Sequence, residues 1–156
     1  MATTKTTKNV TKKKPKPLPG AVQDERFEVR RVKGKGFGMF AVAPVKKGDF
    51  IMEYTGRKIP TPAADGLGTK YLFEIDQEWT IDGSPRSNTA RYINHACKPN
   101  CEVDIRDGRL MLYAIKNIKP GDELSFDYGE EYFNEFITKE KCGCPDCVQE
   151  RAKKAA

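Results

Sequence analysis

The sequence has one histidine, no long hydrophobic run and no acidic residue among its first twenty positions. No apolar stretch approaches the roughly 18–20 residues that a membrane-spanning helix needs. The N-terminal segment is rich in threonine and lysine and lacks the apolar core of a secretory signal peptide. We therefore expect a soluble, intracellular protein without a membrane partner, and 156 residues suffice for one domain with a single core.

The positive charge of the chain is concentrated at its N-terminus. Residues 1–20 contain six lysines, and subtracting them from the 28 basic residues leaves 22, which balances the 22 acidic residues. Such a segment cannot bury enough apolar surface to offset its ordering entropy, so we predict a disordered lysine-rich tail over residues 1–20. The alternatives for its role are a solubilising segment, an arm that contacts nucleic acid weakly, or a lysine-rich substrate mimic.

The five cysteines are odd in number and grouped in two short stretches. This usage favours metal binding in a reducing compartment over a disulfide framework. The spacing Cys142-x-Cys144-x-x-Cys147 supplies three thiolates, one fewer than a tetrahedral zinc site needs. No cysteine cluster precedes residue 97.

Residues 91–101, RYINHACKPNC, hold the densest group of chemically active side chains. They include the single histidine, His95, and two of the cysteines, Cys97 and Cys101. The PN pair between these cysteines favours a sharp turn. The density indicates a functional site, and the alternative is a polar loop with an incidental histidine. A cysteine hydrolase is a weaker interpretation, because side chains two residues apart rarely face each other.

Short alternating segments with frequent turn signals predict a mainly β fold, and no segment shows a long helical period. Strands are expected over residues 27–32, 50–54, 71–76, 79–82, 102–105 and 109–114. The pairs Asp82-Gly83 and Asp107-Gly108 are typical of hairpin turns. The glycine-rich run 33–38 indicates either a tight hairpin or a loop whose backbone approaches a ligand closely. Residues 84–90 predict a short helix.

Three motifs in order, NHACKPN at 94–100, GDELSFDYGEEYF at 121–133 and CGCPDC at 142–147, resemble the signature of the SET-domain protein lysine methyltransferases. The resemblance extends from about Phe27 to Cys147 and includes a short post-SET cysteine motif. It implies several small curved sheets with a knot-like C-terminal threading and few short helices. It also implies a SET domain over residues 21–136 and a post-SET zinc-binding segment with a C-terminal tail over 137–156. This small format resembles stand-alone bacterial or viral members.

The resemblance also assigns roles to residues. It implies a catalytic group formed by Tyr128, Tyr54 and Phe126. It implies S-adenosylmethionine contacts from Lys35, Gly36, Phe37, Tyr71, Arg91, Asn94, His95 and Tyr132. For a single aromatic residue, core packing is the alternative. The family usually has tryptophan at the position of Phe37, which is a departure.

The family also places a fourth zinc ligand two residues after the histidine, here Cys97, which would join Cys142, Cys144 and Cys147. The spacing between Cys144 and Cys147 is shorter than the common post-SET spacing, and Cys101 is expected to be a spare thiol. Phenylalanine at position 126 accompanies di- or trimethylation in the family, so more than one methyl group is expected.

The expected activity is methyl transfer from S-adenosylmethionine to a lysine of a basic protein, with histone, histone-like and ribosomal proteins as candidates. Acidic residues after Tyr128, namely Glu130, Glu131 and Glu135, would attract such a substrate. Automethylation of Lys12, Lys13 or Lys14 is a further expectation. The alternative is an inactive SET-like module that binds chromatin or nucleic acid through residues 1–20. The expected location is the cytoplasm or nucleoid in a bacterium and the nucleus or chromatin otherwise.

Overall fold

A computed structural model describes residues 24–34, 36–129 and 132–155. These residues form small β-sheets joined by turns and short helices, which confirms the predicted mainly β class. The strands are β1 (Phe27–Val32), β2 (Gly36–Ala41), β3 (Phe50–Tyr54), β4 (Arg57–Pro60), β5 (Leu72–Glu74), β6 (Trp79–Asp82), β7 (Asn94–His95), β8 (Cys101–Arg106), β9 (Arg109–Ala114) and β10 (Ser125–Phe126). The helical segments are α1 (Thr61–Ala64), a 3₁₀ turn η1 (Thr89–Tyr92), a π-helical turn η2 (Phe133–Ile137), α3 (Thr138–Lys141) and α4 (Pro145–Ala155).

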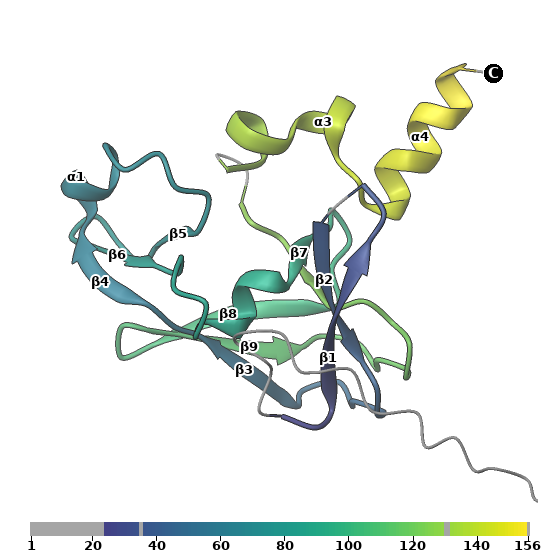
Figure 1. The fold of residues 1–156 in the computed structure, drawn as a ribbon, viewed down its shortest axis with the longest axis horizontal. Coiled ribbons are helices and arrows are strands. Elements are labelled where there is room, and N and C mark those ends of the chain that lie inside the picture. Colours follow the sequence, from purple (N-terminus) through teal and green to yellow (C-terminus); the bar gives the residue numbers. More distant parts are fainter. Residues whose placement is uncertain (1–23, 35, 130–131, 156) are drawn as a thin grey trace, which may run out of the picture.

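The sheets are separate and small (Figure 1). β1 and β2 form an antiparallel hairpin, β3–β9–β8 form one three-stranded sheet, and β4–β6–β5 form another beside α1. β7 and β10 pair in parallel, with Ser125 opposite Asn94 and Phe126 opposite His95. This pair brings together two of the sequence motifs, as the predicted threading requires; the threading itself stays a prediction.

Turn chemistry explains one hairpin and corrects another. Asp107 and Gly108 join β8 to β9 with φ values of 51° and 70°, as a type I′ turn requires. The hairpin predicted around Asp82-Gly83 is wrong, because β5 and β6 are joined by residues 75–78 instead. There the Asp76 carboxylate accepts the backbone N–H groups of Glu78 and Trp79, which closes that turn.

The main core is formed by residues of the β1–β2 hairpin and of the β3–β9–β8 sheet. It is built from alternating strand residues such as Ile51, Leu110 and Leu112, with Ile93 and Leu124 filling the space beside β7. Cys101 also lies in this core, 1% exposed, and burial raises the pKa of its thiol to about 12. The expected spare thiol is therefore an ordinary apolar core residue.

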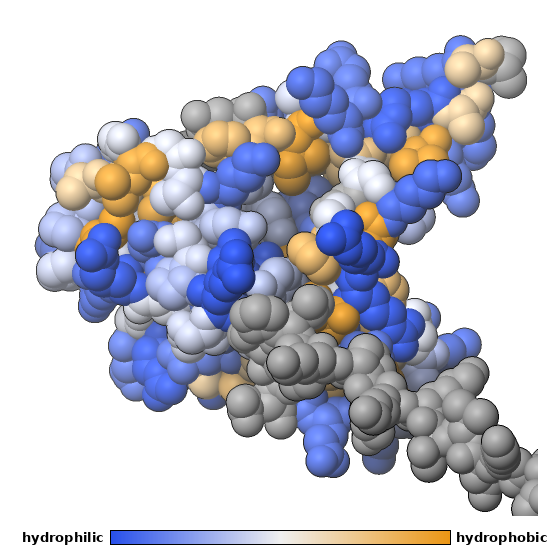
Figure 2. All heavy atoms as spheres, viewed as in Figure 1, coloured by the Kyte–Doolittle hydropathy of each residue, from blue (hydrophilic) through white to orange (hydrophobic). Residues whose placement is uncertain are grey.

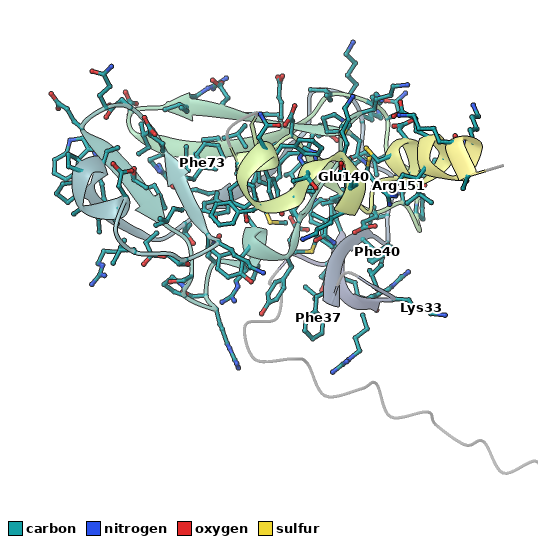
Figure 3. All side chains as sticks on the ribbon, turned by 90° about the horizontal axis from the view of Figure 1, so that it is seen from above. Lys33, Phe37, Phe40, Phe73, Glu140 and Arg151 are labelled. Atoms are coloured by element: carbon teal, nitrogen blue, oxygen red, sulfur yellow. The ribbon has the colours of Figure 1, made fainter. Side chains whose placement is uncertain are left out.

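The C-terminal segment contains an element that the sequence pattern did not predict. α4 is eleven residues long and lies at one edge of the molecule (Figure 1). Arg151 ties it to α3 by donating to the Lys139 carbonyl at 2.7 Å (Figure 3). The predicted helix over 84–90 is also shifted, because η1 begins at Thr89. No helix among the described residues is long and apolar enough to cross a membrane.

Candidate active site and metal centre

A pocket of about 640 Å³ opens where the β1–β2 turn, β5, η1, β7 and the segments after β10 meet. Figure 2 shows apolar side chains in orange near this junction and a largely hydrophilic surface over α4. Ten residues predicted for the site line the pocket: Gly36, Phe37, Tyr54, Tyr71, Arg91, Asn94, His95, Phe126, Tyr128 and Tyr132. Their individual roles stay predictions. Lys35 lies outside the described residues.

Aromatic rings in contact form one wall of the pocket. Tyr54 packs on Phe73 with centroids 5.7 Å apart, Phe73 stacks on Phe126 at 6.3 Å, and Phe126 contacts Tyr128 at 4.7 Å. Tyr132 continues the series 5.1 Å from Tyr128. Phe126 is only 3% exposed, so little water contacts its ring. A ligand can therefore pack against this aromatic wall with little water to displace.

The hydroxyl groups of Tyr54, which is buried, and of Tyr128, which is partly buried, both have backbone partners. Tyr54 donates to the Tyr71 carbonyl at 2.7 Å, and Tyr128 donates to the Ile93 carbonyl. Burial raises the pKa of both phenols well above the usual value. Both side chains therefore stay neutral hydrogen-bond donors over the whole physiological pH range.

His95 connects the pocket to the cysteine cluster. Its Nδ1 accepts the backbone N–H of Tyr128 at 3.1 Å, and its Nε2 lies 3.6 Å from the Cys97 sulfur. Burial lowers the pKa of His95, which favours the neutral ring that this pattern needs. The ring then carries its proton on Nε2, so it accepts on one side and donates on the other.

Asn94 holds the glycine-rich hairpin against the pocket. Its Nδ2 donates to the Phe37 carbonyl and to the Glu123 Oε1, both at 2.8 Å. The first of these bonds joins residues 57 positions apart in the sequence. The Asn94 side chain thus fixes the β2 backbone, while the residue itself lines the cavity.

Arg91 contributes positive charge to the pocket wall. Its guanidinium lies 4.2 Å from the centre of the Tyr71 ring and donates to the Ser84 carbonyl. Its Nε is buried and has no hydrogen-bond partner among the described residues. Arg91 as a whole lines the pocket, so its positive charge favours an anionic group of a ligand there.

Four cysteines form a second centre beside the pocket. The sulfurs of Cys97, Cys142, Cys144 and Cys147 all lie within 4.8 Å of one another, with Cys97 and Cys147 at 3.6 Å. Zinc–sulfur bonds of about 2.3 Å in a tetrahedron place sulfurs about 3.8 Å apart, so this donor set fits a structural zinc ion. Cys142 also lines the pocket, so the two centres share a residue.

The sequence pattern missed three residues that shape the site. Phe73, on β5, completes the aromatic wall (Figure 3). Asn88 is fully buried, accepting the Thr55 N–H and donating to the Gly83 carbonyl, both at 3.0 Å. Asn100 donates to Glu123 and accepts from Ser125. Asn100 belongs to the PN turn pair and to the NHACKPN motif, but neither gave it a role, and nothing in the local sequence gives a role to Phe73 or Asn88.

The expectation that acidic residues after Tyr128 attract the substrate stays a prediction. Glu130 and Glu131 lie outside the described residues, as does the side chain of Glu135. The described lining includes the cations Lys70, Arg86 and Lys141 in addition to Arg91, and no carboxylate.

Comparison with known proteins identifies the family. The family model described as SET domain matches residues 36–129, more than half of the chain. A human histone-lysine N-methyltransferase, H3 lysine-36 specific, is 34% identical over 84% of this chain and 6% of its own length. A Kluyveromyces lactis histone-lysine N-methyltransferase, H3 lysine-4 specific, is 35% identical over 71% of this chain and 13% of its own.

A third relative, histone-lysine N-methyltransferase SUV39H2 of Xenopus tropicalis, is 35% identical over 67% of this chain. The match covers 30% of that protein, so the chain spans less than a third of the length of each of these relatives. The matched residues 36–129 contain nine of the pocket residues predicted from the sequence. The chain belongs to the SET-domain family.

Proposed function

We propose that this protein transfers methyl groups from S-adenosylmethionine to lysine side chains of a basic, histone-like protein. The observation that supports this most strongly is the convergence of Tyr54, Phe126 and Tyr128 with the Asn94-His95 pair on one pocket. Its volume of about 640 Å³ lies within the roughly 300–1,000 Å³ of typical small-molecule sites. The three relatives are named as histone-lysine methyltransferases, which points to the same reaction class.

The pocket has the features that the cofactor needs. The aromatic surfaces of Phe37 and Tyr132 suit the adenine, and the positive charge of Arg91 suits the carboxylate. The remaining contacts would come from the backbone at Gly36 and from Asn94 and His95. When bound, S-adenosylmethionine supplies a methyl group on a positively charged sulfonium.

The protein's own part is to bind a neutral amine in the correct orientation. Free lysine has a pKa of about 10.4, so little of it is neutral at pH 7. Walls made of Tyr54, Phe126 and Tyr128 disfavour the charged ammonium because they remove its water. The Tyr128 hydroxyl lies at the Ile93 carbonyl, next to Asn94, where it can orient the amine. Alignment of the two reactants supplies most of the acceleration, without a strong acid–base pair.

Phe126 bears on the number of methyl groups transferred. Its ring is buried between Phe73 and Tyr128 and carries no hydroxyl that could bond to the amine. An amine free of that bond can rotate after each transfer, so we expect di- or trimethylation.

Zinc is the proposed metal, held by Cys97, Cys142, Cys144 and Cys147. Four thiolates give a closed coordination shell, which is typical of a structural rather than a catalytic ion. The ion would anchor the segment that carries α3 and α4 beside His95. Its role here is therefore to complete the pocket wall at Cys142.

The substrate is proposed only as a class. The human and yeast relatives are named for different lysines of histone H3, so their names favour a histone tail and give no single target. Location at chromatin would follow from such a substrate, and ribosomal proteins are the other basic candidates. Lys12, Lys13 and Lys14 lie in the chain's own tail, outside the described residues. A twenty-residue random coil would span roughly 25 Å, and the composition of residues 1–20 predicts such a coil, so automethylation there is also proposed.

Radiolabelled S-adenosylmethionine tests the function with core histones and a basic protein extract as acceptors. The matched variants are Tyr128→Phe and Tyr113→Phe, since Tyr113 lies on β9, outside the pocket lining. Label that is lost in Tyr128→Phe and kept in Tyr113→Phe supports the proposal. A wild-type protein that neither binds the cofactor nor transfers label contradicts it. Salt-sensitive DNA binding that needs residues 1–20 would then favour the inactive module.

A further inference from the structure

Tyr54 belongs to a closed ring of hydrogen bonds in which only one other side chain takes part. The Tyr54 hydroxyl and the Gly83 N–H both donate to the Tyr71 carbonyl, at 2.7 and 2.9 Å. The Asn88 Nδ2 donates to the Gly83 carbonyl, and the Asn88 Oδ1 accepts the Thr55 N–H, each at 3.0 Å. Thr55 follows Tyr54 in the chain, so the ring closes on the residue where it began.

Among the described residues, the Asn88 side chain is hydrogen-bonded only to the backbone of Thr55 and Gly83. It is 0% exposed, and its amide accepts one backbone N–H and donates to one backbone carbonyl, both beside the pocket residue Tyr54. Gly83 lies directly against the Tyr54 ring, since a Cβ built on it would be 2.4 Å from the ring carbon Cε1. A shift of Gly83 therefore changes the backbone surface against which the aromatic ring of Tyr54 packs.

We propose that Asn88 is a positioning residue that holds Tyr54 in place in the lysine channel, that is, the space for the substrate amine between Tyr54, Phe126 and Tyr128. It acts on Tyr54 from two sides, through the backbone of Thr55 and through Gly83. The proposal rests on the proposed function for its catalytic consequence, and on the hydrogen-bond ring alone for its structural one. Because the buried Asn88 amide is hydrogen-bonded through both its Oδ1 and its Nδ2, this ring of hydrogen bonds limits the motion of Tyr54 and so the width of the space beside it.

The decisive variant is Asn88→Asp. When ionised, the new carboxyl keeps the size of the side chain and the acceptor for Thr55, but it replaces the donor to Gly83 with an oxygen that repels the carbonyl. A protonated carboxyl would restore the donor, so both readouts are taken at a pH at which the carboxyl is ionised. The matched control is Asn117→Asp, since the exposed Asn117 also accepts a backbone N–H, that of Lys47 at 2.9 Å. Both variants replace one side-chain amide by a carboxyl, and only Asn88→Asp alters the ring of hydrogen bonds around Tyr54.

The first readout needs no enzyme activity. Tyrosine labelled with ¹³C in its ring reports the flip rate of Tyr54 by NMR, with the resonance assigned from Tyr54→Phe. We expect faster flipping of Tyr54 in Asn88→Asp and unchanged flipping in Asn117→Asp. Unchanged flipping of Tyr54 in a folded Asn88→Asp protein would overturn the proposal, whatever the protein's activity.

The second readout is kinetic. Misplacement of a channel residue by about 1 Å can lower a rate up to 100-fold, so we expect kcat to fall roughly 10- to 100-fold in Asn88→Asp. The KM for the cofactor should stay unchanged. If Asn88→Asp does not fold, the smaller change Asn88→Ser is compared in the wild type and in Tyr54→Phe. The loss in kcat should shrink in the Tyr54→Phe background, because the ring is already open there.

Equal losses in the two backgrounds would show that Asn88 supports the fold without acting through Tyr54, and would refute the proposal. The proposed function can fail separately. A wild-type protein without methyl transfer would remove the kinetic readout, while the NMR measurement would still decide whether Asn88 holds Tyr54.

Discussion

Asn100 gives the most direct test of how the site is assembled. Its Nδ2 donates to the Glu123 carbonyl at 2.9 Å, and its Oδ1 accepts the Ser125 N–H at 2.9 Å. These bonds hold the chain at the start of β10, which pairs with β7 and carries Phe126 into the pocket. Asn100→Ala removes both bonds and leaves two part-buried backbone groups without these partners.

The size of the effect follows from the two bonds. Each hydrogen bond contributes about 0.5–1.5 kcal/mol net, so the free energy of unfolding should fall by about 1–3 kcal/mol. For a domain of this size one kcal/mol corresponds to roughly 4 °C in the melting temperature, which gives a fall of about 4–12 °C. The rate of methyl transfer should fall as well, because Phe126 and Tyr128 follow the released segment.

Thermal unfolding of the zinc-loaded protein measures this effect, with Asn117→Ala as the control. Asn117 is exposed and accepts one bond, from the Lys47 N–H at 2.9 Å, so its loss should cost less than about 1 kcal/mol. A fall in melting temperature that is no larger for Asn100→Ala than for Asn117→Ala would refute the view that this clamp holds the site together.

Three further variants test individual parts of the site. Tyr128→Phe should lower kcat roughly 100- to 1,000-fold while cofactor binding, measured by calorimetry, is kept; an unchanged kcat would contradict its role. Phe126→Tyr should shift the products, measured by mass spectrometry, toward monomethyl-lysine, and an unchanged ratio would count against the channel assignment. Metal analysis should detect one zinc ion per chain in the wild type; Cys147→Ser should lose it, whereas Cys101→Ser, a change in the core, should keep it.

Local chemistry accounts for what the sequence pattern predicted correctly. The Asp107-Gly108 turn needs only two residues that tolerate positive φ, so the β8–β9 hairpin could be predicted. The Asp82-Gly83 pair carries the same signal but follows β6, where Gly83 donates to the Tyr71 carbonyl instead. A turn pair predicts a bend, and the pairing of the flanking strands decides whether that bend makes a hairpin.

Contacts between distant residues account for what could not be predicted from the pattern. The β7–β10 pair has two residues in each strand, which is too short for any periodicity to show. Only the family resemblance brought the two motifs together. Phe73 and Asn88 were missed because neither belongs to a motif and their partners lie far from them in the chain. α4 was missed because its apolar positions other than Cys147 and Val148 are alanines, which make a weak apolar pattern.

The geometry around His95 explains why the two centres depend on each other. One ring nitrogen accepts the Tyr128 N–H and the other faces the Cys97 sulfur, so the ring transmits any displacement of the cysteine to the backbone of Tyr128. Cys142 makes a second connection, since it belongs to the cysteine cluster and to the pocket wall. A zinc ion bound there would therefore not contact the reacting atoms. It would fix the positions of the Tyr128 backbone and of the pocket wall at Cys142. Loss of zinc should then impair cofactor binding and methyl transfer together, whereas loss of the Tyr128 hydroxyl should impair transfer alone.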